Sequence, residues 1–137
     1  ISEQEAYIRA IGQANQPFLK AYSEELYAIE DLLVTIEKKG LDDPEIIAYF
    51  SEKNEAMQDA IERILTIPVP TVWVPEHSQL LSLFIRVSLA NQYIAEKRND
   101  PIQTTIALST LIEHAETLGT IAETYEAKIQ KQGLTLK

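Results

Sequence analysis

Apolar side chains recur every three, four or seven positions along residues 3–39, a spacing that places them on one face of an α-helix. The stripe keeps its phase across Pro17, so we expect either one helix kinked at this proline or two nearly coaxial helices. Gly40 is expected to end this first helix. The stripe consists of Ile8, Ile11, Phe18, Tyr22, Leu26, Ile29, Leu33 and Ile36.

Two Asp-Pro pairs predict the starts of further helices, because aspartate is a favoured N-cap and proline fits the first helical turn. Asp43-Pro44 opens a helix that ends before Pro68, and Asp100-Pro101 opens one that runs to about Gln132. The stripe of the former is Ile47, Phe50, Asn54, Met57, Ile61 and Ile64. The stripe of the latter is Leu108, Leu111, Ala115, Leu118, Ala122, Tyr125 and Ile129.

The remaining helix, from about Pro75 to Arg98, is apolar around most of its circumference. A helix of this kind is buried on more than one side, so we expect something besides the bundle core to cover its second face. Its expected core stripe is Leu80, Phe84, Val87 and Ile94, and its second face carries Ile85, Leu89 and Tyr93.

The lengths of the connections predict an all-α fold, an antiparallel four-helix bundle made of two helical hairpins. About four residues join the first two helices and about two join the last two, and such short links make antiparallel neighbours. We expect a single domain over residues 1–137, with hairpin one at 3–66, hairpin two at 75–132 and a tail at 133–137. Between the hairpins, residues 67–74 form an extended, proline-rich linker.

The net charge of −9 and the absence of cysteine exclude several classes of function. Nucleic acids and anionic membranes are poor partners for an acidic chain, because binding them needs positive charge. The only short basic runs, Lys38-Lys39 and Lys97-Arg98, lie at expected helix ends, where they complement the helix dipole. Without cysteine there is no disulfide, zinc finger or thiol chemistry.

No catalytic motif or metal site is predicted. A carboxylate-bridged di-metal bundle needs Glu-x-x-His on two helices, but Val74 and Leu111 stand three positions before His77 and His114. We expect both histidines to be surface or boundary groups, separated by about 12 Å across the second hairpin. The chain has no Gly-rich phosphate loop and no nucleophile elbow. We therefore expect a protein without enzymatic activity and without a cofactor.

Two asparagines occupy core stripes, Asn54 in the second helix and Asn91 in the third, at similar heights in an up-down bundle. Buried asparagines can fix the register of packed helices. They can also contact a ligand. The alternative function is therefore a sensory four-helix ectodomain that binds a small molecule between its helices through Asn54 and Asn91.

The chain also carries more apolar side chains than a plain bundle buries. One interpretation is intramolecular: the linker and tail fold over the third helix, and the tryptophan closes one end of the bundle. The other is a surface for a protein partner or for self-association, since monomers rarely expose large apolar patches. The candidate partner-binding residues are Trp73, Ile85, Leu89, Tyr93, Ile102 and Ile106.

Residues 67–136 resemble an uncharacterised helical domain that recurs in predicted cell-envelope proteins of candidate-phylum bacteria. The resemblance is carried by Val69-Pro70, His77-Ser78-Gln79-Leu80-Leu81, Asp100-Pro101-Ile102, Tyr125 and Gly133-Leu134. It implies an anchored, extracytoplasmic domain of unknown function and brings no catalytic residues.

From these observations we expect a helical interaction or scaffold domain, the exposed part of a larger cell-envelope protein. The chain starts at Ile1, and its single methionine is Met57, so we expect an upstream segment to supply any membrane anchor. The membrane is then contacted only through that segment. A cytoplasmic location stays open, because the absence of cysteine fits either side of a membrane.

Overall fold

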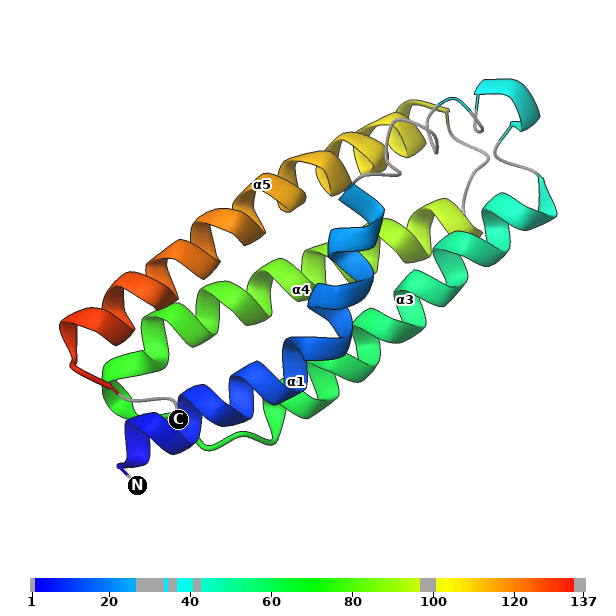
Figure 1. Ribbon diagram of the computed structural model, residues 1–137. Helices are drawn as coiled ribbons and strands as arrows, with labels where there is room; N and C mark the ends of the chain where they lie inside the picture. The colour runs from blue at the N-terminus through cyan, green and yellow to red at the C-terminus, as the bar shows by residue number, and fades with distance from the viewer. Residues whose placement is uncertain (1, 27–33, 35–36, 41–42, 97–100, 135–137) are drawn as a thin grey trace.

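The computed structural model describes residues 2–26, 34, 37–40, 43–96 and 101–134, and within them the fold is all-α (Figure 1). The helices are α1 (Glu3–Leu26), α3 (Pro44–Leu65), the short 3₁₀ helix η1 (Thr71–Trp73), α4 (Val74–Glu96) and α5 (Pro101–Lys131). The described residues contain no β-strand. The all-α prediction is confirmed.

The first expected helix, 3–39, is only partly described. Helical backbone runs without interruption from Glu3 through Pro17 to Leu26, and Val34 and 37–39 are also helical. Residues 27–33 and 35–36 lie outside the described part of the chain. Gly40 has φ +81°, the left-handed conformation that favours glycine after a helix. Figure 1 shows that the axis of α1 bends along its course.

The helix ends follow the sequence signals closely. The Asp43 side chain accepts a 3.0 Å hydrogen bond from the Glu45 backbone N–H, and Pro44 begins α3. At the end of α5, Gly133 has φ +66°. Its N–H and that of Leu134 bond back to the carbonyls of Gln130 and Ile129, which is the pattern of a Schellman motif.

The expected extended linker 67–74 is shorter in the structure. Only residues 67–70 lie outside helices, since Thr71–Trp73 form η1 and α4 begins at Val74. The Trp73 N–H donates to the Pro70 carbonyl at 2.9 Å, which closes the 3₁₀ turn. The composition of two prolines and three valines suggested extension throughout, but the buried Trp73 side chain draws the second half of the linker into a helical turn.

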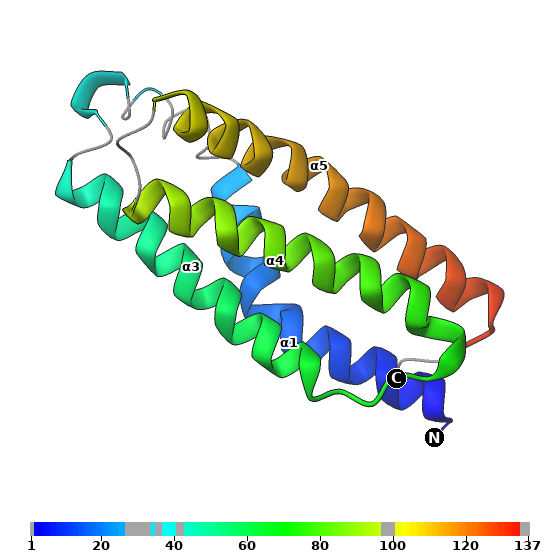
Figure 2. The same ribbon diagram turned by 180° about the vertical axis from the view of Figure 1, so that it is seen from behind.

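Helix α4 contacts both α3 and α5, and α1 contacts α3. Figures 1 and 2 agree that α3, α4 and α5 lie side by side along the long axis of the molecule. The start of α1 and the end of α5 lie at the same end of the molecule.

The core consists of two clusters. The first gathers side chains from α1, α3, η1, α4 and α5 at the end where α1 starts, including Tyr7, Ile64, Trp73 and Phe84. The second joins α3, α4 and α5 around Ile46, Phe50, Ala90 and Ile94.

The core faces of α3 and α5 differ slightly from the expected stripes. On α3, Ile46 is buried and Ile47 is only half-buried. On α5, Ile121 is buried and Ala122 is exposed. Each stripe is therefore rotated by about one residue at these points, because neighbours on two sides widen the buried face.

No helix within the described ranges has the length and apolar character needed to cross a lipid bilayer.

Candidate functional site

Six large aliphatic side chains among the described residues of α4 and α5 are exposed to solvent, and four of them form two pairs. Ile85 and Leu89 lie one turn apart on α4 and are 42% and 59% exposed. Ile102 and Ile106 lie one turn apart on α5 and are 73% and 52% exposed. Residues four apart share one face of a helix, so each pair forms a local apolar strip. We call these four residues the aliphatic surface.

The other two candidate partner-binding residues are not part of this surface. Trp73 is fully buried and belongs to the first core cluster, so it does not lie on the surface of the described structure. Tyr93 is half-buried and packs against the second core cluster. Trp73 lies within a group of polar and aromatic side chains inside the first core cluster. We call this group the polar cluster.

A hydrogen-bonded chain of three side chains joins three helices in this cluster. The Tyr7 hydroxyl of α1 lies 3.0 Å from Nδ1 of His77 on α4 and 2.8 Å from the hydroxyl of Tyr125 on α5. Tyr7 is 2% exposed and His77 is 9% exposed, so His77 is buried and is not the surface or boundary group that we expected. The residue is buried because Tyr7 supplies a partner for its ring nitrogen.

Trp73 contacts the other side chains of the polar cluster. Its ring stacks on Tyr125 with centroids 5.2 Å apart and an interplanar angle of 25°, and its indole N–H donates to the Gln4 side chain at 2.9 Å. The Lys128 ammonium lies 4.8 Å from the centroid of the Trp73 ring and 2.7 Å from a Glu76 carboxylate oxygen. The lysine therefore combines an ion pair with a cation–π contact.

Burial sets the ionisation of the cluster. It raises the pKa of the Tyr7 hydroxyl far above its usual value, and the hydrogen bond to Tyr125 adds to this. Burial also raises the pKa of Tyr125 and lowers the pKa of His77. At neutral pH the chain of three side chains is therefore uncharged, which suits its place in the core.

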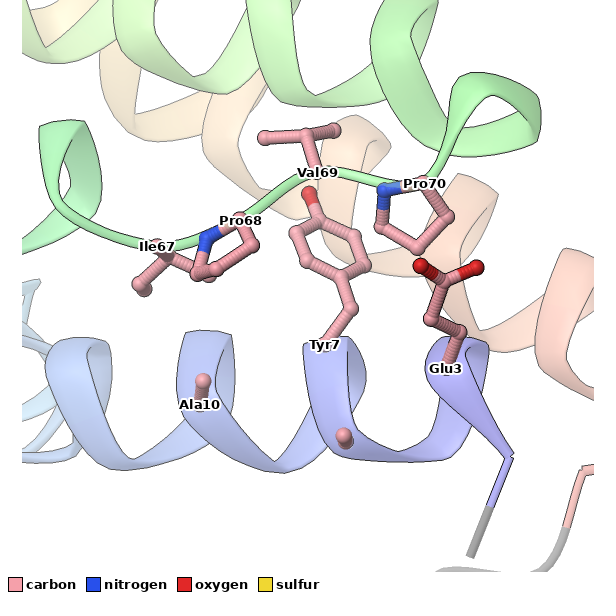
Figure 3. A pocket seen from close by; sticks show the side chains of 8 residues that line it. Glu3, Tyr7, Ala10, Ile67, Pro68, Val69 and Pro70 are labelled. Carbon is pink, nitrogen blue, oxygen red and sulfur yellow. The ribbon is translucent and has the colours of Figure 1, made fainter.

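A pocket of about 270 Å³ opens beside this cluster, between the first turns of α1 and the linker (Figure 3). Its α1 wall is Glu3, Ala6, Tyr7 and Ala10 and its linker wall is Ile67, Pro68, Val69 and Pro70. Figure 3 shows the Glu3 side chain reaching across towards Pro70. Apart from the Glu3 carboxylate and the Tyr7 hydroxyl, the lining side chains are apolar.

The two asparagines proposed as ligand contacts lie elsewhere. Asn54 accepts a 2.7 Å hydrogen bond from the Ser88 hydroxyl, and the Asn91 amide donates to the Val87 carbonyl at 3.1 Å. Both asparagines therefore bond to α4, and neither lines the pocket beside Tyr7. Because Asn54 meets Ser88, one turn before Asn91, the two lie at nearly the height expected.

The second histidine is half-buried on α5. Both ring nitrogens of His114 are buried without a hydrogen bond to any described residue. Burial and the nearby Arg86 lower its pKa. Among the residues that the structure describes, no three histidine or acidic side chains come close enough together to hold a metal ion.

Sequence reasoning missed Tyr7, Gln4 and the Glu76–Lys128 pair. Tyr7 is adjacent to Ile8 of the expected stripe, but its partners are 70 and 118 positions away. The available signal was the helix pairing itself, since a tyrosine at the start of α1 and one near the end of α5 meet only if both ends lie together.

No family model, no curated protein and no solved structure matches this chain.

Proposed function

We propose that this chain is a non-enzymatic helical interaction domain that binds a protein partner or a second copy of itself through the aliphatic surface. The observation that carries the proposal is the 42–73% exposure of Ile85, Leu89, Ile102 and Ile106. Removing such a side chain from water contributes on the order of 1 kcal/mol when half of it is already buried. Four of them on two adjacent helices supply a hydrophobic centre for an interface.

Within the same proposal, the two aliphatic strips belong to one surface. Tyr93 lies one turn after Leu89 on α4 and packs against the second core cluster, which includes Ala107. Ala107 is the neighbour of Ile106 on α5. The helices that carry the two strips, α4 and α5, pack against each other, which supports a single surface.

The proposed architecture is an antiparallel four-helix bundle made of two hairpins, with the bend of α1 at Pro17. Two observations support it: α4 packs against both α3 and α5, and the links before α4 and between α4 and α5 are short. Proline in a helix interior removes one backbone hydrogen bond, which is a common cause of a bend.

We further propose that the domain is the exposed, extracytoplasmic part of a larger cell-envelope protein. The support is the resemblance carried by spaced residues between 67 and 136. Any attachment to the membrane is made by a segment outside this chain.

Site-specific photo-crosslinking in the producing cell tests the interaction surface. A photoreactive phenylalanine analogue at Leu89 or Ile106 is expected to give a discrete crosslinked product. The same analogue at Gln58, exposed on α3, is the control. Equal crosslinking from Gln58, or no product from either surface position, would refute the proposal.

The solution mass then separates the two kinds of partner. Light scattering over a wide concentration range is expected to show a dimer if the partner is a second copy, and Leu89→Lys with Ile106→Lys is expected to give a monomer of about 15.5 kDa. A dimer that survives both substitutions would show that self-association uses another surface.

A further inference from the structure

The pocket beside Tyr7 lies away from the aliphatic surface and carries a separate inference. It is bounded by two turns of α1 and by Ile67, Pro68, Val69 and Pro70 of the segment between α3 and η1 (Figure 3). Its volume of about 270 Å³ is just below the range of about 300–1,000 Å³ that holds drug-sized ligands. The pocket therefore fits a small molecule and not a peptide.

The lining is poor in hydrogen-bond donors. Pro68 and Pro70 have no backbone N–H, so the linker wall has fewer amide donors than an ordinary segment. The Tyr7 hydroxyl is already engaged with His77 and Tyr125. No lysine, arginine or histidine lines the pocket.

Glu3 is the charged side chain that lines the pocket. Its carboxylate forms no hydrogen bond or ion pair with any other residue that the structure describes, and it reaches across the pocket towards Pro70 (Figure 3). The positive end of the α1 dipole, equivalent to about half a charge, is outweighed by the two carboxylates of the first turn, Glu3 and Glu5. The mouth of the pocket is therefore negative.

We propose that this pocket binds a small amphipathic organic cation, in which an ammonium group is attached to a short apolar body. The apolar body lies against Ile67, Val69 and the proline rings, and the ammonium group donates to the Glu3 carboxylate. Both contacts follow from complementarity: apolar lining against hydrocarbon, and acceptors with a net negative charge against a cationic donor. The net charge of −9 favours the approach of such a ligand.

The test uses n-hexylammonium as the probe and hexan-1-ol as its neutral counterpart, followed by amide chemical shifts in ¹⁵N-labelled protein. With the amine we expect saturable shifts, with a dissociation constant in the millimolar range, centred on Tyr7, Ala10 and Val69. The alcohol should bind about two- to fivefold more weakly, the factor expected for a partly exposed ion pair. Equal binding of the two probes, shifts centred elsewhere, or no saturable shifts would overturn the proposal.

Paired variants locate the two contacts. Glu3→Gln should abolish the preference for the amine, whereas Glu52→Gln on α3, outside the pocket, should preserve it. Ala10→Leu should fill part of the pocket and weaken both probes at least several-fold, whereas Ala56→Leu, the same change at an exposed site on α3, should not. An amine preference that survives Glu3→Gln would show that another group recognises the charge, and the proposal would be wrong.

Discussion

Replacing Tyr7 by phenylalanine removes the hydroxyl that joins α1 to α4 and α5 and keeps the ring that packs in the core. Two hydrogen bonds are lost, at 3.0 Å to His77 and 2.8 Å to Tyr125, and both partners are left inside the cluster. A hydrogen bond contributes about 1 kcal/mol net, and a buried group left without its partner adds to the loss. We therefore expect the free energy of unfolding to fall by about 2–3 kcal/mol.

The assay is thermal and urea unfolding followed by far-ultraviolet circular dichroism. Unfolding entropy scales with chain length, so for 137 residues this loss corresponds to a melting temperature lower by about 7–10 °C. Tyr93→Phe is the matched control, since Tyr93 is a half-buried tyrosine whose hydroxyl forms no hydrogen bond with the described residues. Its effect should stay below about 0.5 kcal/mol. If the two variants lose equal stability, the buried chain of side chains does not hold α1 in place.

Three further results are expected. Burial lowers the pKa of His77 and of His114, so the unfolded chain binds protons more readily than the folded one. The two histidines therefore leave the free energy of unfolding unchanged above their unfolded pKa of about 6.5 and reduce it as the pH falls below that value. Urea midpoints measured between pH 7.5 and 5 should show this loss of stability, and His114→Gln should make the loss smaller. A midpoint independent of pH would contradict the lowering of the two histidine pKa values by burial. Gly133→Ala should destabilise by about 1 kcal/mol because φ is +66° there, whereas Gly119→Ala, inside α5 with open space around its Cβ, should stabilise by about 0.5–1 kcal/mol in the same urea experiment. Trp73, the single tryptophan, should show blue-shifted fluorescence that acrylamide quenches poorly, and ready quenching in the folded protein would show that the first core cluster is open.

Local signals in the sequence were sufficient to predict most helix boundaries. Asp43-Pro44 predicted the start of α3, and Gly40 has the positive φ expected after a helix. These features depend on residues within a few positions of each other, where capping and backbone preferences dominate. The extended linker was predicted too long for the same reason: the proline and valine composition says nothing about the cavity that receives Trp73.

The polar cluster could not be predicted because it depends on where distant helices meet. Tyr7 and Tyr125 are 118 positions apart, and a shift of one helical turn would separate their hydroxyls. Periodicity identifies the buried face of each helix but not the height at which two faces meet. The exposure of a side chain also depends on distant parts of the chain. Ile85 and Trp73 are both apolar residues of neighbouring segments, but Ile85 is 42% exposed and Trp73 is fully buried.

The position of the two helix ends has a mechanical consequence. The start of α1 and the end of α5 lie together at one end of the molecule (Figure 1), and the Tyr7–Tyr125 contact joins them there. Tension applied between the start of α1 and the end of α5 would act sideways across these helices and load the contacts at this end first, among them the Tyr7–Tyr125 hydrogen bond. Such a geometry opens one contact after another, like a zipper, instead of resisting as a whole. Trp73 stacks on Tyr125, so its fluorescence would report the first step of opening under force.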